Sequence, residues 1–249
     1  MLRHKVMTKI KIVVANMGES KSFFRGITLI ELLIAIVVGS IVLTAAASGM
    51  INLLTVNNSI ESKTIRNAGL VKALAYIQDD IKRAKYITAE KATSGGNCNS
   101  LDIDSGDCLV LTYPDNTPLR VGCDGVTPTI YYGFKDISNN KNEIWLKPGI
   151  LKRKIICTNG SVGNWIVIAD GLLGKKEVNL ITTLINNPDF CTQDSIKWTG
   201  NLTVYGEGGF RFCLQESHNQ NRLARIFLYG HIINDKPISL STIIFTRSQ

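Results

Sequence analysis

The chain has 249 residues, of which 45% are hydrophobic and 19% are charged, and its formal net charge is +8 at pH 7. This composition excludes a disordered chain, because it supplies enough apolar side chains for a core, and the length suits one sizeable domain with a membrane or targeting segment. The basic excess does not by itself indicate a nucleic-acid-binding protein, since most of it lies in residues 1–26.

Residues 1–26 form a basic leader, which contains six lysines and arginines and one acidic residue, Glu19. Leaders of this sign stay on the cytoplasmic side of a membrane. We therefore predict that the amino terminus is cytoplasmic and that the rest of the chain is exported. Translation could begin at Met1 or at Met17, which would give a shorter leader.

An apolar segment covers residues 27–54, and no formal charge lies between Glu31 and Glu61. About 20 helical residues cross a hydrocarbon core of about 30 Å, so this segment predicts a transmembrane helix. It is rich in small residues around Gly39 and Gly49, which favours close packing against other helices. Glu31 conflicts with a simple anchor, because a carboxylate in hydrocarbon has to be paired or neutralised.

Three interpretations of this segment remain open. It could be an uncleaved signal anchor, or a secretory signal cut after Ala47 that releases a soluble domain. It could also follow a leader that is removed after Gly26, which leaves Ile27 as a new amino terminus. Glu31 fits the third interpretation best, because the amine of a neighbouring subunit would neutralise its carboxylate.

The stretch RGITLIEL, residues 25–32, resembles the processing site of type IV prepilins and pseudopilins. The resemblance implies that prepilin peptidase cuts after Gly26, that Ile27 becomes the N-methylated terminus, and that Glu31 is the carboxylate used in filament assembly. The sequence departs from the family pattern at Ile27, where phenylalanine is commoner, and at Ser48, where many major pilins have a proline. The second departure favours a minor subunit.

Residues 55–90 are predicted to continue the helix as an amphipathic half. Leu70, Leu74, Ile77 and Ile81 recur at helical spacing, and the polar side is assigned to Lys72, Asp79, Asp80, Lys82 and Arg83. We expect the apolar stripe to pack against a globular domain. Residues 76–87 also resemble the end of the long helix in W-type minor pilins and J-type pseudopilins.

Residues 91–249 are predicted to form a β-rich domain, which makes the fold class α+β and pilin-like. Turn-forming residues end the helix near Lys91. Short apolar or alternating runs then indicate an antiparallel sheet. The predicted strands are CLVLTY, TIYYGF, NEIWL, ILKRKIIC, NWIVIADGL, VNLITTLI, LTVYG, GFRFCL, RLARIFLYGHII and SLSTIIFT.

All six cysteines follow the apolar segment, which indicates disulfides in an oxidising compartment such as a periplasm. Six cysteines allow fifteen pairings, and the sequence does not choose among them. The pairing that we put forward is Cys98 with Cys108, Cys123 with Cys157, and Cys191 with Cys213. No Cys-x-x-Cys or Cys-x-x-His spacing occurs, so zinc is not expected.

No catalytic residue, metal site or cofactor is predicted. His4, His218 and His231 are scattered, and the glycine-rich run at residues 205–210 reads as a turn between strands. The residues Asp102, Asp104 and Asp107 could bind calcium, but such clusters are typical of solvated turns. The basic runs at residues 152–154 and 175–176 are interpreted as solvated surface, so nucleic acid is not an expected partner.

The functional hypothesis is a non-enzymatic minor pilin or pseudopilin with its globular domain in the periplasm or outside the cell. The expected partners are prepilin peptidase, other minor and major pilins or pseudopilins, and inner-membrane lipid. A place at the filament tip follows from the family resemblance alone. The alternatives are a secreted binding protein and a pilus-borne adhesin or DNA-binding subunit.

Overall fold

The computed structural model has two compact units, residues 1–55 and residues 56–249. Helix α1, Leu29–Arg83, is a single element of 55 residues whose sequence contains no proline. The structure describes residues 28–91, 98, 103, 106–114, 123, 126–160, 163–180, 190–192, 202–215, 220–232 and 236–247.

Helix α1 ends at Arg83, whereas the sequence analysis extended the helix to residue 90. Strand β1, Tyr86–Lys91, follows almost at once, and the N–H of Lys85 already donates to the carbonyl of Thr112. The run YITAEK explains the difference, because aromatic and β-branched residues favour a strand when a neighbouring strand is available. Here that neighbour is β2, Asp107–Thr112, which pairs with β1 along its whole length.

The part of α1 within the second unit buries the predicted apolar stripe of Leu70, Leu74, Ile77 and Ile81. Asp80 is also buried, with 6% of its surface exposed, although the sequence analysis placed it on the polar side. Helical spacing predicted that Asp80 would face solvent with its polar neighbours. The structure instead pairs its carboxylate with a cation on the sheet, which offsets the free-energy cost of burying the charge.

The described strands form one nine-stranded antiparallel sheet in the order β1-β2-β3-β4-β5-β8-β7-β6, and β9 pairs with β8. This arrangement confirms the predicted α+β class, with one long amino-terminal helix followed by an antiparallel sheet. The remaining strands are β3 Pro128–Asp136, β4 Gly149–Cys157, β5 Ile166–Leu172, β6 Leu202–Glu207, β7 Phe210–Gln215, β8 Leu223–Gly230 and β9 Ile238–Phe245.

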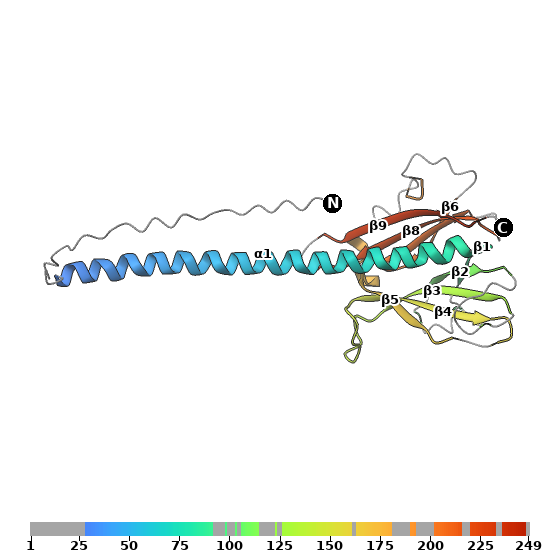
Figure 1. The fold of residues 1–249 in the computed structure, drawn as a ribbon, viewed down its shortest axis with the longest axis horizontal. Helices are drawn as coiled ribbons and strands as arrows, with labels where there is room; N and C mark the ends of the chain where they lie inside the picture. The colour runs from blue at the N-terminus through green and yellow to red at the C-terminus, as the bar shows by residue number, and fades with distance from the viewer. Residues whose placement is uncertain are drawn as a thin grey trace, which may run out of the picture. The chain divides into compact units, whose positions relative to one another are not determined.

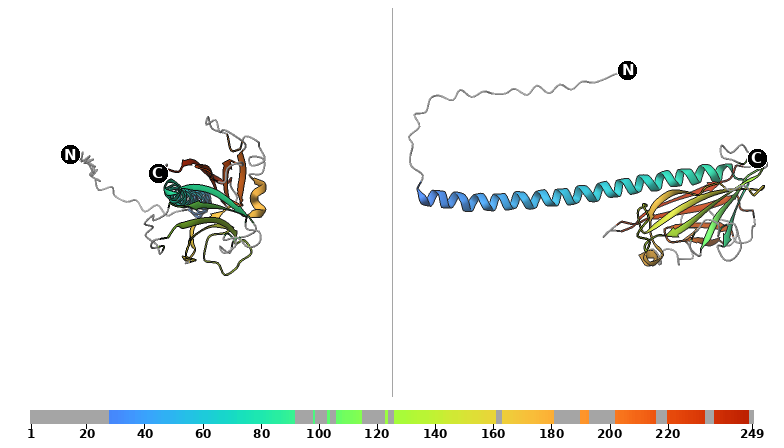
Figure 2. Two further views of the ribbon diagram at one scale, coloured as in Figure 1. Left: turned by 90° about the vertical axis from the view of Figure 1, so that its right-hand side faces the viewer. Right: turned by 90° about the horizontal axis from the view of Figure 1, so that it is seen from below.

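The sheet curves around α1 within the second unit. Strands β8 and β9 lie on one side of this part of the helix and strands β2 to β5 lie on the other (Figures 1 and 2). Strands β5 and β8 join the two sides through one residue pair, Leu172 and Gly230. The main core lies between the helix and both sides of the sheet; its buried members include Leu70, Ile77, Ile81, Leu109, Tyr132, Leu151, Phe212 and Ile226.

Two runs predicted as strands are not strands. Residues 142–146 lie in the loop between β3 and β4, where Asn142 donates to the Asn140 side chain at 3.2 Å and Leu146 donates to the Asp170 carboxylate at 3.1 Å. These side chains take backbone donors that a sheet would otherwise use. The second run begins in a 3-10 helix, η2 (Lys175–Leu180), and its remainder lies outside the described residues.

Candidate processing and assembly site

The amino-terminal end of α1 is closed by Thr28 and Glu31. The N–H of Thr28 and its hydroxyl both donate to Oε2 of Glu31 at 3.0 Å, and the N–H of Glu31 donates back to Oγ1 of Thr28 at 3.4 Å. This reciprocal pattern is a capping box, which satisfies backbone donors that the first helical turn leaves unpaired. This cap was not among the features predicted from the sequence, although the spacing Thr-x-x-Glu just before an apolar run is its usual signal.

The capping box uses only part of the Glu31 carboxylate. Its bonds go to Oε2, and no residue that the structure describes pairs with Oε1. The side chain is exposed within its unit. Glu31 can therefore hold the helix end and still accept from an external cation. Gly26 and Ile27, the predicted processing residues, lie outside the described part of the chain.

Helix α1 is long and apolar enough to cross a membrane, and its apolar residues 29–54 lie in the first unit. Hydroxyl groups in this stretch donate to helix carbonyls one turn earlier, as Thr44 does to Ser40 at 2.6 Å and Ser48 does to Thr44 at 2.9 Å. These side chains therefore bring no unpaired donor into a bilayer. The apolar side chains of residues 29–54 are exposed within the unit, so they are available to lipid or to other helices.

Residues 21–47 match the family model of the prokaryotic N-terminal methylation motif. The chain carries a type IV pilin-like prepilin signal. The match covers Gly26, Ile27 and Glu31, and it begins before the described residues and continues into the first turns of α1. No curated protein and no solved structure matches the chain. The prepilin signal and the long apolar helix fit a membrane-anchored pilin-like protein.

Three disulfides lie in the second unit. They join Cys98 to Cys108, Cys123 to Cys157 and Cys191 to Cys213, the same pairs that the sequence analysis put forward. All six cysteines are buried.

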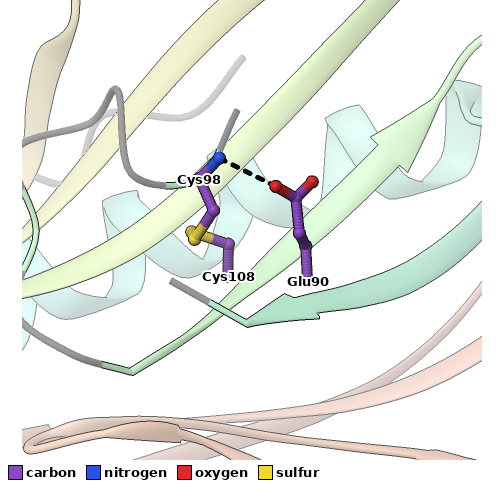
Figure 3. The surroundings of a disulfide bond; sticks show 3 residues. All are labelled: Glu90, Cys98 and Cys108. Atoms are coloured by element: carbon purple, nitrogen blue, oxygen red, sulfur yellow. Dashed lines mark hydrogen bonds between the residues drawn. A yellow bond between two sulfur atoms is a disulfide. The ribbon is translucent and has the colours of Figure 1, made fainter. Parts of the chain in front are cut away.

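The disulfide between Cys98 and Cys108 is tied to strand β1. Figure 3 shows the Glu90 carboxylate accepting from the N–H of Cys98, at 3.0 Å. Glu90 also lies directly across the β1–β2 ladder from Cys108. The disulfide and the hydrogen bond therefore hold Cys98 to both strands.

A buried polar cluster connects α1 to the sheet. Asp80 of α1 accepts from Nε of Arg153, on β4, at 2.7 Å, and both side chains are 9% exposed. The Tyr132 hydroxyl donates to the same carboxylate, and the Tyr113 hydroxyl donates to the Asp80 carbonyl at 2.8 Å. The Arg153 guanidinium also lies over the Tyr76 ring, 5.3 Å from its centroid. The cluster therefore joins Asp80 of α1 to three other parts of the chain, at Tyr113, Tyr132 and Arg153.

Electrostatics in the cluster favour one protonation state. Burial and the neighbouring Asp80 carboxylate raise the pKa values of Tyr113 and Tyr132. Burial alone would lower the pKa of Arg153, but its hydrogen bond to Asp80 and the nearby charges more than offset this effect, so its pKa is raised. Both tyrosines therefore stay neutral and Arg153 stays charged at neutral pH. We interpret this cluster as a structural lock, meaning that its contacts with Asp80 hold α1 to strands β3 and β4.

The basic runs form the predicted solvated surface only in part, since Lys176 is exposed and Lys154 and Lys175 are partly buried. Lys152 and Arg153 are buried. Alternation along β4 separates them as expected, since Arg153 meets Asp80 while Nζ of Lys152 lies 4.1 Å from the centroid of the Trp165 ring. Lys175 pairs with Glu207 at 2.6 Å. Lys152, Arg153 and Lys175 therefore make their contacts with other side chains of the domain.

Within the described part of the chain, no three His, Cys, Asp or Glu residues are grouped so that they could hold a metal ion. Nδ1 of His231 lies 3.0 Å from the Glu177 carboxylate, and Asp107 begins β2. The run at residues 205–210 contains the end of β6, the turn at residues 208–209 and the start of β7. The other residues weighed in the sequence analysis, Asp102, Asp104, His4 and His218, lie outside the described residues.

Proposed function

We propose that the protein is a minor pilin or pseudopilin, which prepilin peptidase processes after Gly26 and which assembles into a pilus or pseudopilus. One observation carries the proposal: α1 begins at Leu29, inside the methylation motif of residues 21–47, and its start is capped by Thr28 and Glu31. Cleavage after Gly26 would free the Ile27 amine immediately before Thr28. The new terminus would then lead directly into a helix that already carries its own cap.

The proposed mechanism has three steps. The basic leader stays in the cytoplasm while the apolar half of α1 spans the inner membrane. Processing then removes the leader and methylation modifies Ile27. Finally, the apolar helix leaves the lipid by packing with helices of other pilin-like subunits, and Oε1 of Glu31 accepts from the amine of a neighbour. An unpaired carboxylate would be costly in the apolar interior of such a filament, which favours this pairing.

In this proposal the second unit serves a structural role outside the cytoplasm. Three disulfides suit an oxidising compartment, and the buried lock around Asp80 suits a rigid platform at the end of a helix. A place at the filament tip is part of the proposal by analogy with minor subunits.

The deciding experiment is to determine the amino-terminal residue and the intact mass of the protein purified from the membranes of its own cells. The proposal expects a chain that begins at N-methylated Ile27. A chain that begins at Ser48 would mean a secreted soluble domain and would end the pilin proposal. An intact leader would mean a membrane anchor that is not processed, which also contradicts the proposal.

A further inference from the structure

The loop between β3 and β4 presents apolar side chains to solvent. Ile144 is 87% exposed, the largest exposed fraction among the large hydrophobic residues that the structure describes, and Leu146 is 51% exposed. Trp145, between them, is partly exposed. Contiguous exposed apolar residues mark interaction sites, whereas single scattered ones are normal on any protein surface. We call residues 141–147 the β3–β4 tip.

Hydrogen bonds hold the β3–β4 tip in position. The N–H of Leu146 donates to the Asp170 carboxylate at 3.1 Å, and the Leu146 carbonyl accepts from the N–H of Gly171 at 2.7 Å. Both partners belong to β5, so the backbone of Leu146 is fixed to the sheet. The N–H of Asn142 is bonded as well, to the side chain of Asn140. The exposure of the apolar side chains is therefore a feature of the folded loop.

The β3–β4 tip lies beside the first turns of α1 in the second unit. Leu146 and Asp170 line a hollow of about 430 Å³ together with Asn58 and Glu61 of α1. Figure 1 shows the loop reaching out from the sheet near β5. The apolar segment ends at Leu54, four residues before Asn58. Four residues span at most about 14 Å. The tip therefore stays close to the end of the apolar segment at any angle between the two units.

Lysines flank the apolar residues of the β3–β4 tip. Lys141 and Lys147 are both exposed, and the acidic residue between them, Glu143, accepts from the Asn140 amide at 3.1 Å. Lysine lays its methylene groups along apolar surface while its charge stays in water, and tryptophan is enriched at membrane interfaces. The tip thus combines exposed aliphatic side chains, a tryptophan and two lysines, which are the residue types of a segment that lies in a membrane interface.

We propose that the β3–β4 tip docks on the surface of the membrane that α1 spans, with Ile144 and Leu146 at the boundary of headgroups and acyl chains and the two lysines at lipid phosphates. The tether through α1 makes this second contact intramolecular, so a few apolar side chains are enough to hold it. The inference rests on the membrane anchoring in the proposed function, but not on processing or on entry into a filament. It gives the domain a fixed position against the membrane before assembly.

The tether also favours lipid over a protein partner as the occupant. An anchored molecule keeps the tip within reach of lipid at all times, whereas a protein groove has to arrive by diffusion. Anionic lipid also attracts lysines placed on both sides of the apolar residues.

The test uses the full chain in vesicles of phosphatidylethanolamine and phosphatidylglycerol, in which some acyl chains carry bromine close to the headgroup. Bromine quenches tryptophan fluorescence on contact. We expect quenching that Trp145→Phe removes, because this tryptophan lies in the tip. Trp165→Phe is the matched control, since Trp165 is 43% exposed but lies next to Ile166, at the opposite end of β5 from the residues that hold Leu146. Its loss should leave the quenching in place.

A second set of variants tests the side chains that enter the interface. Ile144→Glu should abolish the quenching of Trp145, because a carboxylate is costly in lipid, and should leave the stability unchanged because the side chain is exposed. Val71→Glu places the same charge on an exposed part of α1 and should leave the quenching unchanged. Lys141→Glu combined with Lys147→Glu should remove the gain in quenching that phosphatidylglycerol gives over vesicles without it.

Flotation of the chain with the vesicles is measured alongside, so that two kinds of failure are distinguishable. A chain that does not float would contradict membrane anchoring, and with it both the proposed function and this inference. A chain that floats but shows no quenching of Trp145 would overturn this inference alone. Shielding of Trp145 from the brominated lipid and from iodide alike would assign the tip to a protein surface, such as a second copy of the chain, and would also overturn it.

Discussion

Glu31 closes the amino-terminal end of α1 and, in the proposed function, also pairs with a neighbouring subunit. Its Oε2 atom closes the capping box with Thr28, and its Oε1 atom remains for a partner outside the chain. Glutamine can replace glutamate in a capping box but carries no charge. The two roles therefore respond differently to the same substitution.

We predict that Glu31→Ala and Glu31→Gln both reduce incorporation into filaments while leaving membrane insertion intact. Both variants lose the charge that would pair with a neighbouring amine, but only Glu31→Ala also loses the cap. The measurement is the fraction of the protein in sheared filaments relative to the membrane fraction, in cells that make the variants. Normal incorporation of Glu31→Gln would show that the charge has no part in assembly.

The buried Asp80 carboxylate predicts a large loss of stability when it is removed. Asp80→Ala leaves Arg153 charged and buried without its partner, which typically costs about 3–5 kcal/mol. The measurement is the free energy of urea unfolding of the full chain in detergent. The adjacent Asp79→Ala is the control, because Asp79 pairs with Arg83 on the exposed side of the helix, where such pairs contribute about 0–1 kcal/mol. Equal effects of the two variants would contradict the structural lock.

At the scale of elements, α1 is held to the sheet by its buried stripe. Ile77→Ala should destabilise the domain by about 2–5 kcal/mol, because the isoleucine is fully buried and its loss leaves a cavity. Val71→Ala, on the exposed face of the same helix, should change stability by no more than about 0.5 kcal/mol. Comparison of the two unfolding midpoints checks the assignment, and a Val71 effect as large as that of Ile77 would refute it.

The predicted elements succeeded where a local pattern was unambiguous. The runs that became β2, β3, β4 and β7 alternate or are strongly β-branched, and the structure confirms them as strands. The run at residues 142–146 has similar composition but became a loop, because Asn140 and Asp170 satisfy its backbone donors. The run YITAEK was assigned to the helix because nothing local shows that β2 will lie beside it.

At the scale of the whole molecule, buried tyrosines predict loss of stability at high pH. Burial raises the pKa of Tyr229 to about 12, and the pKa values of Tyr113 and Tyr132 are raised further by burial and the nearby Asp80 charge. In the unfolded chain the pKa of tyrosine is about 10. The contribution of these protonated tyrosines to the free energy of unfolding is therefore fully present below about pH 10. It is lost as the pH rises through their folded-state pKa values.

We expect the free energy of unfolding of the full chain in detergent to fall steadily above about pH 10. Tyr132→Phe should make this fall shallower, because one group with a raised pKa is removed. An unchanged slope in Tyr132→Phe would mean that this hydroxyl does not couple ionisation to folding.

The sequence by itself determined the features that depend on neighbouring residues: the apolar helix, the amphipathic stripe, the β-rich second half and the stretch that matches the methylation motif. Tertiary structure alone decided the burial of Asp80 against Arg153, the use of Lys152 within the domain and the pairing of β9 with β8. The physical reason is the range of the interactions. Helical spacing and alternation act within a few residues, whereas the partner of a charge and the partner of a strand come from distant parts of the chain.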